Sequence, residues 1–303
     1  MTINQRNAVR DMLTRGGGGA QPRPVEELRK GFAEMMSTFP VPSGVTLTDT
    51  TIAGRPAVLV EPRENPRPGT MLYFHGGSFA LGSPSTAMSL TAHLVLRTGI
   101  RALSVDYRLA PENPYPAGVT DCFNAYQALL NQGVAPQEAT ILGDSAGGGL
   151  SVTTVLAAKN AGLPVPSCVV CFSPGLDQRR SGGSFESKRG IDPFFTPEAL
   201  IASGERYLAG SDPHTEMTSP AVYADMKGFP PLLLQVGSDE LLLDDSVRFA
   251  ERARDAEVDV ILDVTAKVPH VFQAFVDHLD EAGDALDRAA LFIRQHVGRS
   301  ATE

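Results

Sequence analysis

Residues 139–152 read ATILGDSAGGGLSV. An apolar run, residues 139–142, leads directly into Gly143-Asp144-Ser145-Ala146-Gly147, and a segment of small residues with helical spacing follows. A strand that enters a helix through a glycine–x–serine–x–glycine turn is typical of a nucleophile elbow. The two glycines let neighbouring chain pass close to a strained turn from which the serine hydroxyl projects. A serine in an ordinary glycine-rich turn would match the five residues alone, but the flanking strand and helix patterns favour the elbow.

Short apolar runs recur on both sides of this stretch, and helical patterns separate them. Such alternation predicts an α/β fold with a mostly parallel central sheet that is flanked by helices. The predicted strands are residues 57–61, 69–74, 102–107, 139–143, 167–172, 232–236 and 259–263. The predicted helices are residues 85–98, 117–132, 146–161, 245–255, 271–281 and 284–296.

Two regions interrupt this alternation. The first 45 residues contain an isolated amphipathic stretch at residues 24–36, and residues 177–228 delay the next strand far longer than an ordinary loop does. We therefore predict a catalytic domain over residues 46–303, with residues 1–45 as an N-terminal cap segment and residues 177–228 as a cap insertion.

Composition and charge exclude several classes of partner. The 303 residues include 35 acidic and 26 basic side chains, a net charge of −9, which repels nucleic acid and anionic membrane surfaces. Three cysteines are too few and of the wrong parity for a secreted disulfide framework, and we expect all three to be buried thiols. The N-terminus lacks the apolar core of a signal peptide, and no later run reaches membrane-spanning length, so the sequence predicts a cytoplasmic protein.

A serine hydroxyl is a poor nucleophile unless a base removes its proton, and the base needs an orienting carboxylate. In chain order the base should follow the acid and the later strands of the sheet. His270 follows the last predicted strand at a loop-to-helix junction, whereas His278 and His296 fall within helical patterns typical of surface residues. We therefore expect His270 to be the base.

The orienting carboxylate should come from the loop after the next-to-last strand. Asp239 stands just beyond the apolar run at residues 232–236, and it is the predicted acid. Asp244 and Asp245 compete for this role, but their position favours capping the helix that follows.

The oxyanion of a tetrahedral intermediate needs backbone donors. One is expected to be the amide of Ala146, directly after the nucleophile, and others come from a glycine-rich loop after an earlier strand. The segment MLYFHGGSF, residues 71–79, supplies that loop with Gly76 and Gly77. His75 precedes the loop on the wrong strand for a base, so we expect it to hold the loop through hydrogen bonds.

Five motifs together resemble the bacterial hormone-sensitive lipase family (family IV) of carboxylesterases in the α/β-hydrolase superfamily. They are HGGSF at residues 75–79, DYRLAPENPYPAG at 106–118, GDSAGG at 143–148, GSDELLLDD at 237–245 and PHVF at 269–272. The resemblance spans residues 45–300 and keeps the family's order and spacing. One departure is Ser78, which replaces the family's third loop glycine and puts the shape of that loop in question.

The resemblance implies an α/β-hydrolase core with a helical cap built from the N-terminal segment and an insertion. It implies Ser145 as nucleophile, His270 as base and Asp239 as its partner. The amides of Gly76, Gly77 and Ala146 are the implied oxyanion donors. No metal or organic cofactor is required for this chemistry.

The expected substrate is a small-molecule ester of a short to medium acyl chain, an expectation that follows from the family. Apolar side chains of the cap are candidates for an acyl or alcohol pocket, and a plain cap core explains them equally well: Met35, Met36, Phe39, Phe194 and Phe195. The alternatives are a lactone, amide or deacetylating hydrolase with the same triad, or a non-catalytic small-molecule receptor. A homodimer through residues 289–297 is a further possibility, although any helix that packs on its own sheet shows the same apolar pattern.

Overall fold

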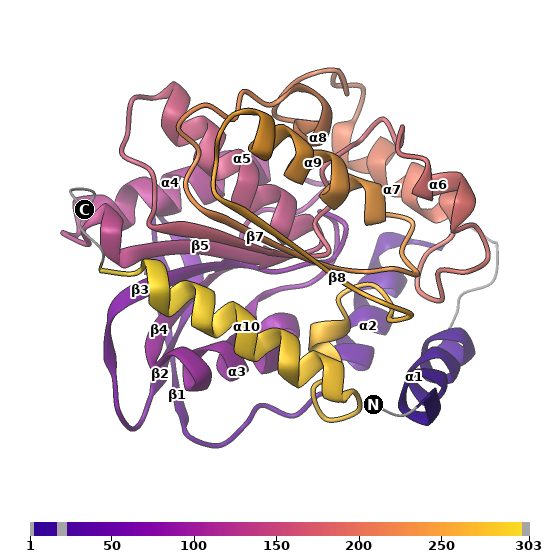
Figure 1. Ribbon diagram of the computed structural model, residues 1–303, viewed down its shortest axis with the longest axis horizontal. Helices are drawn as coiled ribbons and strands as arrows, with labels where there is room; N and C mark the ends of the chain where they lie inside the picture. The colour runs from indigo at the N-terminus through magenta and orange to yellow at the C-terminus, as the bar shows by residue number, and fades with distance from the viewer. Residues whose placement is uncertain (1–2, 17–22, 299–303) are drawn as a thin grey trace.

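An eight-stranded sheet forms the centre of the molecule in the computed structural model, which describes residues 3–16 and 23–298 (Figure 1). Its strand order is β1-β2-β4-β3-β5-β6-β7-β8. The pairs β1–β2 and β2–β4 are antiparallel, and every pair from β4 to β8 is parallel. The strands are β1 (Val45–Ile52), β2 (Arg55–Pro62), β3 (Arg67–Phe74), β4 (Ile100–Val105), β5 (Ala139–Asp144), β6 (Cys168–Phe172), β7 (Leu232–Gly237) and β8 (Val260–Thr265).

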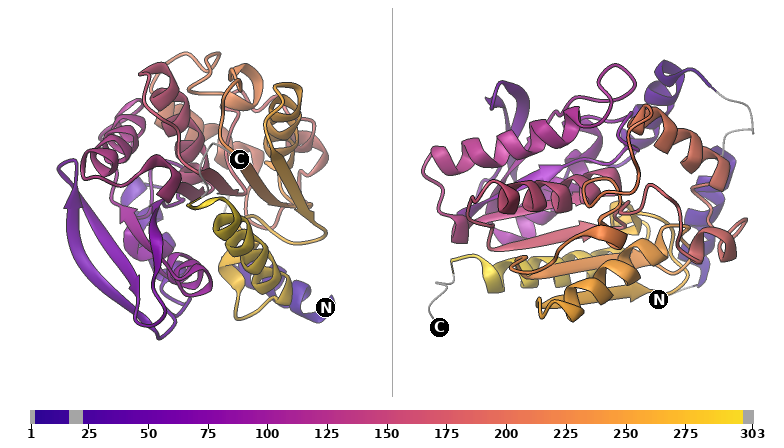
Figure 2. Two further views of the ribbon diagram at one scale, coloured as in Figure 1. Left: turned by 60° about the vertical axis from the view of Figure 1, so that its left-hand side comes forward. Right: turned by 90° about the horizontal axis from the view of Figure 1, so that it is seen from above.

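Helices cover both faces of the sheet (Figures 1 and 2). Helices α3 (Met88–Thr98) and α10 (Asp280–His296) pack on one face, with an apolar layer that includes Leu94 and Ile293. The other face carries the second apolar layer and α4 (Ala117–Asn131), α5 (Ala146–Asn160) and α9 (Leu243–Asp255). The remaining helical segments are α1 (Ile3–Gly16), α2 (Val25–Met36), α6 (Ser184–Ser187), α7 (Pro197–Leu208), α8 (Pro220–Tyr223), η1 (Pro84–Ala87), η2 (Pro136–Glu138) and η3 (Phe272–Phe275).

All seven predicted strands are present, and the predicted α/β architecture, a mostly parallel central sheet flanked by helices, is confirmed. The sequence analysis missed β1, whose residues VTLTDTTI are mostly exposed and polar at the sheet edge. A helix over residues 271–281 was wrong. Val271 takes a left-handed conformation, φ 50°, before the 3-10 turn η3, and Leu279 is extended, φ −128° and ψ 121°, so that α10 begins only at Asp280.

Two parts of the chain lie outside the sheet and reach the carboxyl ends of its parallel strands. Helix α2 contacts the loop after β3 through Arg29, and residues 194–195 contact His270, which follows β8. Helix α1 lies near α2 in Figure 1, while residues 1–2 and 17–22 of the predicted cap segment fall outside the described residues. The assignment of residues 1–45 and 177–228 as a cap remains a prediction.

The apolar side of the C-terminal helix packs within the molecule. Leu286, Ala289 and Ile293 of α10 are fully buried against the sheet, so this face is not free to bind a partner. This packing accounts for the apolar pattern at residues 289–297, and the homodimer stays a prediction. No helix in the described ranges has the length and apolar character needed to cross a membrane.

The three cysteines are free and buried, as predicted. Cys168 packs in the α3–α10 layer and Cys171 in the α4–α5–α9 layer, because residues three apart on β6 point to opposite faces. Burial raises the pKa of both thiols, to about 11 for Cys168 and well above its usual value for Cys171. This CxxC is therefore part of the core.

Candidate active site

Ser145 occupies the sharp turn between β5 and α5 that the sequence predicted. Its backbone has φ 52° and ψ −116°, a conformation that costs a non-glycine residue about 1–3 kcal/mol. The surroundings hold it there: the Ser145 amide donates to the carbonyl of Phe172 at 2.8 Å. A Cβ atom on Gly147 would overlap the carbonyl of Phe74, so only glycine fits at this point of the turn.

The structure brings His270 to this serine. The His270 Nε2 atom lies 2.8 Å from Ser145 Oγ, and the two side chains are 125 residues apart in the chain. Both are buried, at 2% and 8% exposed. The pair is therefore shielded from bulk water and within hydrogen-bonding distance.

The carboxylate on the other side of the imidazole belongs to Glu240, and this corrects the prediction of Asp239. Glu240 Oε2 lies 2.8 Å from His270 Nδ1, and the Glu240 side chain is fully buried. Asp239 instead faces Arg10 at 3.7 Å and is 20% exposed. Because an ionised carboxylate can only accept, Nδ1 carries the proton and Nε2 is left to accept the Ser145 hydroxyl proton.

The turn after β7 explains why the inward residue is Glu240. Gly237 donates its amide to Glu240 Oε1, and a Cβ atom on Gly237 would collide with the carbonyl of Val268. Glycine thus lets the chain fold back so that the third residue after it points inward. The two other acidic candidates do not cap α9: Asp244 accepts from Ser184, and Asp245 accepts from the amides that follow Gly175.

Ser173 ties the acid to the histidine loop. This fully buried residue lies just beyond β6 in a left-handed conformation, φ 47°. Its hydroxyl donates to Glu240 Oε1 at 2.7 Å and accepts from the amide of Val271 at 3.0 Å. One side chain therefore fixes both Glu240 and the residue next to His270.

The predicted oxyanion donors need one correction. The Gly76 amide already donates to Asp144 Oδ1 at 3.0 Å and is not free for a substrate. In the described part of the chain, the amides of Gly77, Ser78 and Ala146 have no protein acceptor. Ser78 takes a left-handed conformation, φ 54°, so the loop keeps the backbone shape of a glycine despite the substitution.

Asp144 connects the loop after β3 to the elbow. Its Oδ1 atom accepts from the Tyr73 hydroxyl at 2.7 Å as well as from Gly76. Burial raises the pKa of the Asp144 carboxyl, and these two donors oppose that effect. The loop and the elbow are thereby joined through one side chain.

His75 has the supporting position that the sequence predicted. Its ring stacks on Tyr107 with centroids 4.3 Å apart, and Nδ1 donates to the carbonyl of Gly76 at 2.7 Å. Among the described residues, nothing pairs with its buried Nε2 atom. Burial lowers the pKa of His75 to about 4, so the ring is neutral near pH 7.

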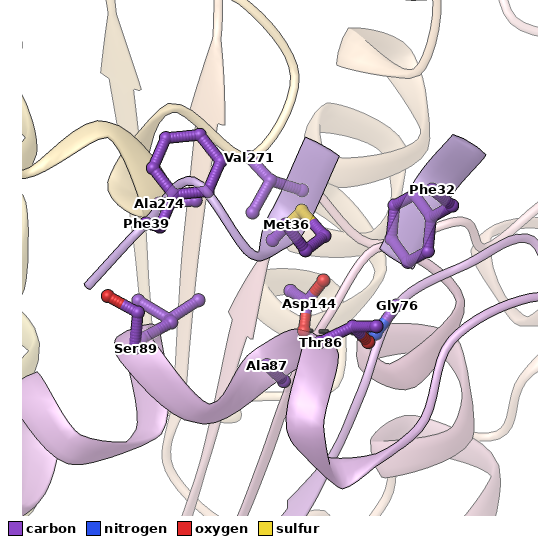
Figure 3. Close-up of a pocket in the computed structure, with 11 residues that line it drawn as sticks. Phe32, Met36, Phe39, Gly76, Thr86, Ala87, Ser89, Asp144, Val271 and Ala274 are labelled. Carbon is purple, nitrogen blue, oxygen red and sulfur yellow. Dashed lines mark hydrogen bonds between the residues drawn. The ribbon is translucent and has the colours of Figure 1, made fainter. Parts of the chain in front are cut away.

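An apolar cavity of about 20 Å³ adjoins this site. Figure 3 shows Phe32 and Met36 of α2 on one side of it, with Asp144 and Gly76 opposite. Residues of three further segments complete the lining, namely Phe39, Thr86, Ala87, Ser89, Leu90, Val271 and Ala274. Three of the lining residues are sequence neighbours of residues with a predicted role: Gly76 precedes Gly77, Asp144 precedes Ser145, and Val271 follows His270.

The predicted pocket residues divide into three groups. Met36 and Phe39 line the cavity, and Met35 does not. Phe194 and Phe195 pack instead on the imidazole of His270, with ring centroids 5.6 and 4.7 Å from it.

Sequence reasoning missed Phe32, although it stands four residues before Met36 on the same side of a helix. It also missed Ser173 and Glu240. Ser173 follows a buried strand end directly, which was the available signal.

Comparisons with known proteins identify the family. Residues 71–274 match a family model described as alpha/beta hydrolase fold. The chain is 40% identical over 229 residues to an acetyl-hydrolase of Streptomyces hygroscopicus, which covers 76% of each protein. It is 37% identical to an esterase of Acinetobacter venetianus over 88% of this chain and 87% of that protein. The crystal structure of an esterase from the bacterial hormone-sensitive lipase family superposes with a TM-score of 0.93 and 36% identity, covering 98% of this chain and all of the other.

Proposed function

Because the chain belongs to the alpha/beta hydrolase fold family and, within it, to the bacterial hormone-sensitive lipase family of esterases, we propose that it is a serine carboxylesterase. Ser145 is the nucleophile, His270 the general base and Glu240 the acid that orients His270. The observation that carries the proposal is the pair of 2.8 Å contacts that His270 makes, one with each partner.

The reaction proceeds in two halves. Ser145 Oγ attacks the ester carbonyl while His270 Nε2 takes its proton, and the imidazolium then protonates the departing alcohol. Water, activated by the same nitrogen, hydrolyses the acyl-enzyme and releases the acid. Glu240 stays ionised and stabilises the imidazolium through Nδ1.

The amides of Gly77, Ser78 and Ala146 are the proposed oxyanion donors. In the described chain these three amides have no protein acceptor, and Gly76 leaves the predicted set because its amide donates to Asp144. Each such donor contributes about 3 kcal/mol of transition-state stabilisation.

The cavity lined by Gly76, Asp144 and Val271, which are sequence neighbours of the site residues, supports a short acyl group. A volume of about 20 Å³ is close to what one or two water molecules require. An acetyl methyl fits that space, while longer acyl chains require Met36 or its neighbours to move. Methionine has flexible torsions that allow such movement at low cost. We therefore place the optimum at acetyl and expect a decline through the medium chain lengths.

Residues 1–45 and 177–228 act in this proposal as a cap over the strand ends. The support is that α2 lines the cavity and that Phe194 and Phe195 cover His270. A cap in these positions excludes water from the imidazole and limits the size of the substrate.

Removal of an acetyl group from a larger compound is the second candidate. The relative of Streptomyces hygroscopicus, 40% identical, is an acetyl-hydrolase, and an acetyl-sized cavity suits that activity equally well. A non-catalytic receptor is disfavoured by a complete serine–histidine–glutamate arrangement.

The test is hydrolysis of p-nitrophenyl esters from acetate to decanoate by the wild type and by Ser145→Ala. Ser85→Ala, a change at an exposed serine, is the matched control. Circular dichroism establishes that each variant is folded. We expect turnover of the short esters by wild type and control, and none by folded Ser145→Ala. Inactivity of the folded wild type on every ester would reject the esterase proposal, and full activity of Ser145→Ala would reject the serine mechanism.

A further inference from the structure

One arginine of α2 is bonded to two loops of the catalytic domain. Arg29 Nε donates to the carbonyl of Ala80 at 2.9 Å, and Nη2 donates to the carbonyl of Ala110 at 3.0 Å. The same guanidinium pairs with both oxygens of Glu112 at 2.7 Å. Arg29 thus makes four hydrogen bonds outside its own helix.

The two loops are also hydrogen-bonded to each other. Ala80 belongs to the loop after β3, two residues beyond the proposed donor Ser78, and its amide donates to the carbonyl of Gly77 at 3.0 Å. The amide of Ala110 donates to the carbonyl of Phe79 at 2.9 Å. Arg29 therefore binds the same backbone turn that carries the proposed oxyanion donors Gly77 and Ser78.

Helix α7 also contacts this turn. Ser203 of α7 donates to the carbonyl of Ser78 at 3.3 Å, and Tyr207 stacks on Phe79 with ring centroids 3.8 Å apart. The residues from 77 to 79 all have positive φ, so the turn occupies a conformation that neighbours must maintain. Helices α2 and α7 supply those neighbours.

We infer that Arg29 is a positioning residue for the hydrolysis, one that sets the oxyanion loop through Ala80 and Ala110. The inference rests on the proposed function and adds a specific group of the N-terminal segment to it. Docking of α2 then does two things at once: Phe32 and Met36 close the cavity, and Arg29 fixes the loop that stabilises the transition state.

The pair with Glu112 orients the arginine more than it stabilises the fold. Arg29 is 28% exposed and Glu112 is 50% exposed, and exposed ion pairs contribute about 0–1 kcal/mol. Arg29 lowers the pKa of Glu112 to about 2, so the carboxylate is charged throughout the working pH range. By contrast, Ala80 and Ala110 are buried, and their carbonyls have no other donor in the described chain.

The experiment compares Arg29→Met, which keeps the length of the side chain and removes its donors, with Arg29→Lys and with the control Lys30→Met. Lys30 is the next residue, is 79% exposed and pairs with the exposed Glu34 at 3.9 Å. Burst titration with p-nitrophenyl acetate counts active sites, so that kcat refers to folded enzyme. A trifluoromethyl ketone, which forms a tetrahedral adduct with the serine, reports on the oxyanion loop directly.

For Arg29→Met we expect kcat per active site to fall about 10- to 100-fold, the range for a small misplacement of catalytic groups, with KM little changed. Affinity for the ketone should fall in parallel, Arg29→Lys should recover part of both, and Lys30→Met should match the wild type. A normal kcat per active site in Arg29→Met, with or without a lower melting temperature, would overturn the inference. An inactive wild type or an active Ser145→Ala would instead reject the proposed function.

Discussion

The Glu240 carboxylate lies 2.8 Å from His270 Nδ1, while the neighbouring Asp239 faces Arg10 near the surface. Two adjacent acidic residues thus have different surroundings. Glu240 is fully buried, and its second oxygen accepts from Ser173 and from the Gly237 amide. The residue with the fully satisfied carboxylate is the one suited to orient a histidine.

Glu240→Gln should lower kcat strongly, and Asp239→Asn should not. A glutamine can present an amide N–H to His270 and so stabilise the wrong tautomer, and such changes cost about 10²- to 10⁴-fold. Steady-state hydrolysis of p-nitrophenyl acetate measures both variants. Equal losses in the two, or a larger loss in Asp239→Asn, would return the role to Asp239.

Ser173→Ala should weaken the site without removing any proposed catalytic group. The variant removes two buried hydrogen bonds: the one that the Val271 amide donates to Ser173 and the one that Ser173 donates to Glu240 Oε1. We expect the free energy of unfolding to fall by about 1–3 kcal/mol. Urea denaturation measures that loss, and kcat should also drop because His270 and Glu240 are less firmly held. Ser167→Ala offers a comparison at the opposite end of β6, where the hydroxyl donates to the carbonyl of Ala139 and kcat should stay at the wild-type value. An unchanged kcat in folded Ser173→Ala would show that Glu240 and His270 hold their geometry alone.

Met36→Ala should shift the acyl-chain preference toward longer esters. The change enlarges the cavity of about 20 Å³ by removing a lining side chain. Met35→Ala, an adjacent change outside the lining, is the matched control. The ratio of kcat/KM for hexanoate to that for acetate should rise about tenfold in Met36→Ala, which corresponds to about 1.4 kcal/mol. The same rise in both variants would mean that loosening of the cap, and not the cavity, sets chain length.

His75 should make stability depend on pH below neutrality. Its pKa is about 4 in the folded protein and about 6.5 in the unfolded chain, so between these values the unfolded state binds the additional proton. The contribution of neutral His75 to stability is therefore complete above pH 6.5 and is lost toward pH 4, at about 1.4 kcal/mol per pH unit. Urea denaturation from pH 7.5 to 4.5 should show a steeper decline in the wild type than in His75→Asn. Parallel curves would show that His75 does not titrate in this way.

Much of the sheet was predictable because its strands are buried on both faces. The runs that became β5, β6 and β7 are apolar without alternation, as expected between two helical layers. Strand β1 escaped prediction because it lies at the sheet edge, where few apolar residues are needed. Its antiparallel pairing with β2 holds it in the sheet. The break between η3 and α10 escaped because the extended backbone of Leu279, φ −128° and ψ 121°, has no signature in the apolar spacing, which continues through it.

The site was predictable where local sequence determines geometry. Ser145 is fixed by its elbow, and His270 by the end of the last strand. In the turn after β7 no helical or strand periodicity tells which of two adjacent carboxylates points inward, and the choice of Glu240 depends on backbone folding at Gly237. The engagement of the Gly76 amide likewise depends on the tertiary position of Asp144.

Ser145 should carry the acyl group during turnover, and trapping the acyl-enzyme shows whether it does. The enzyme would be mixed with p-nitrophenyl acetate, quenched in acid within the burst phase, digested and analysed by mass spectrometry. We expect one acetyl group per active site on the peptide that contains Ser145, and none on that peptide in Ser145→Ala. Turnover without acetylation of that peptide, or acetylation confined to another residue, would contradict it.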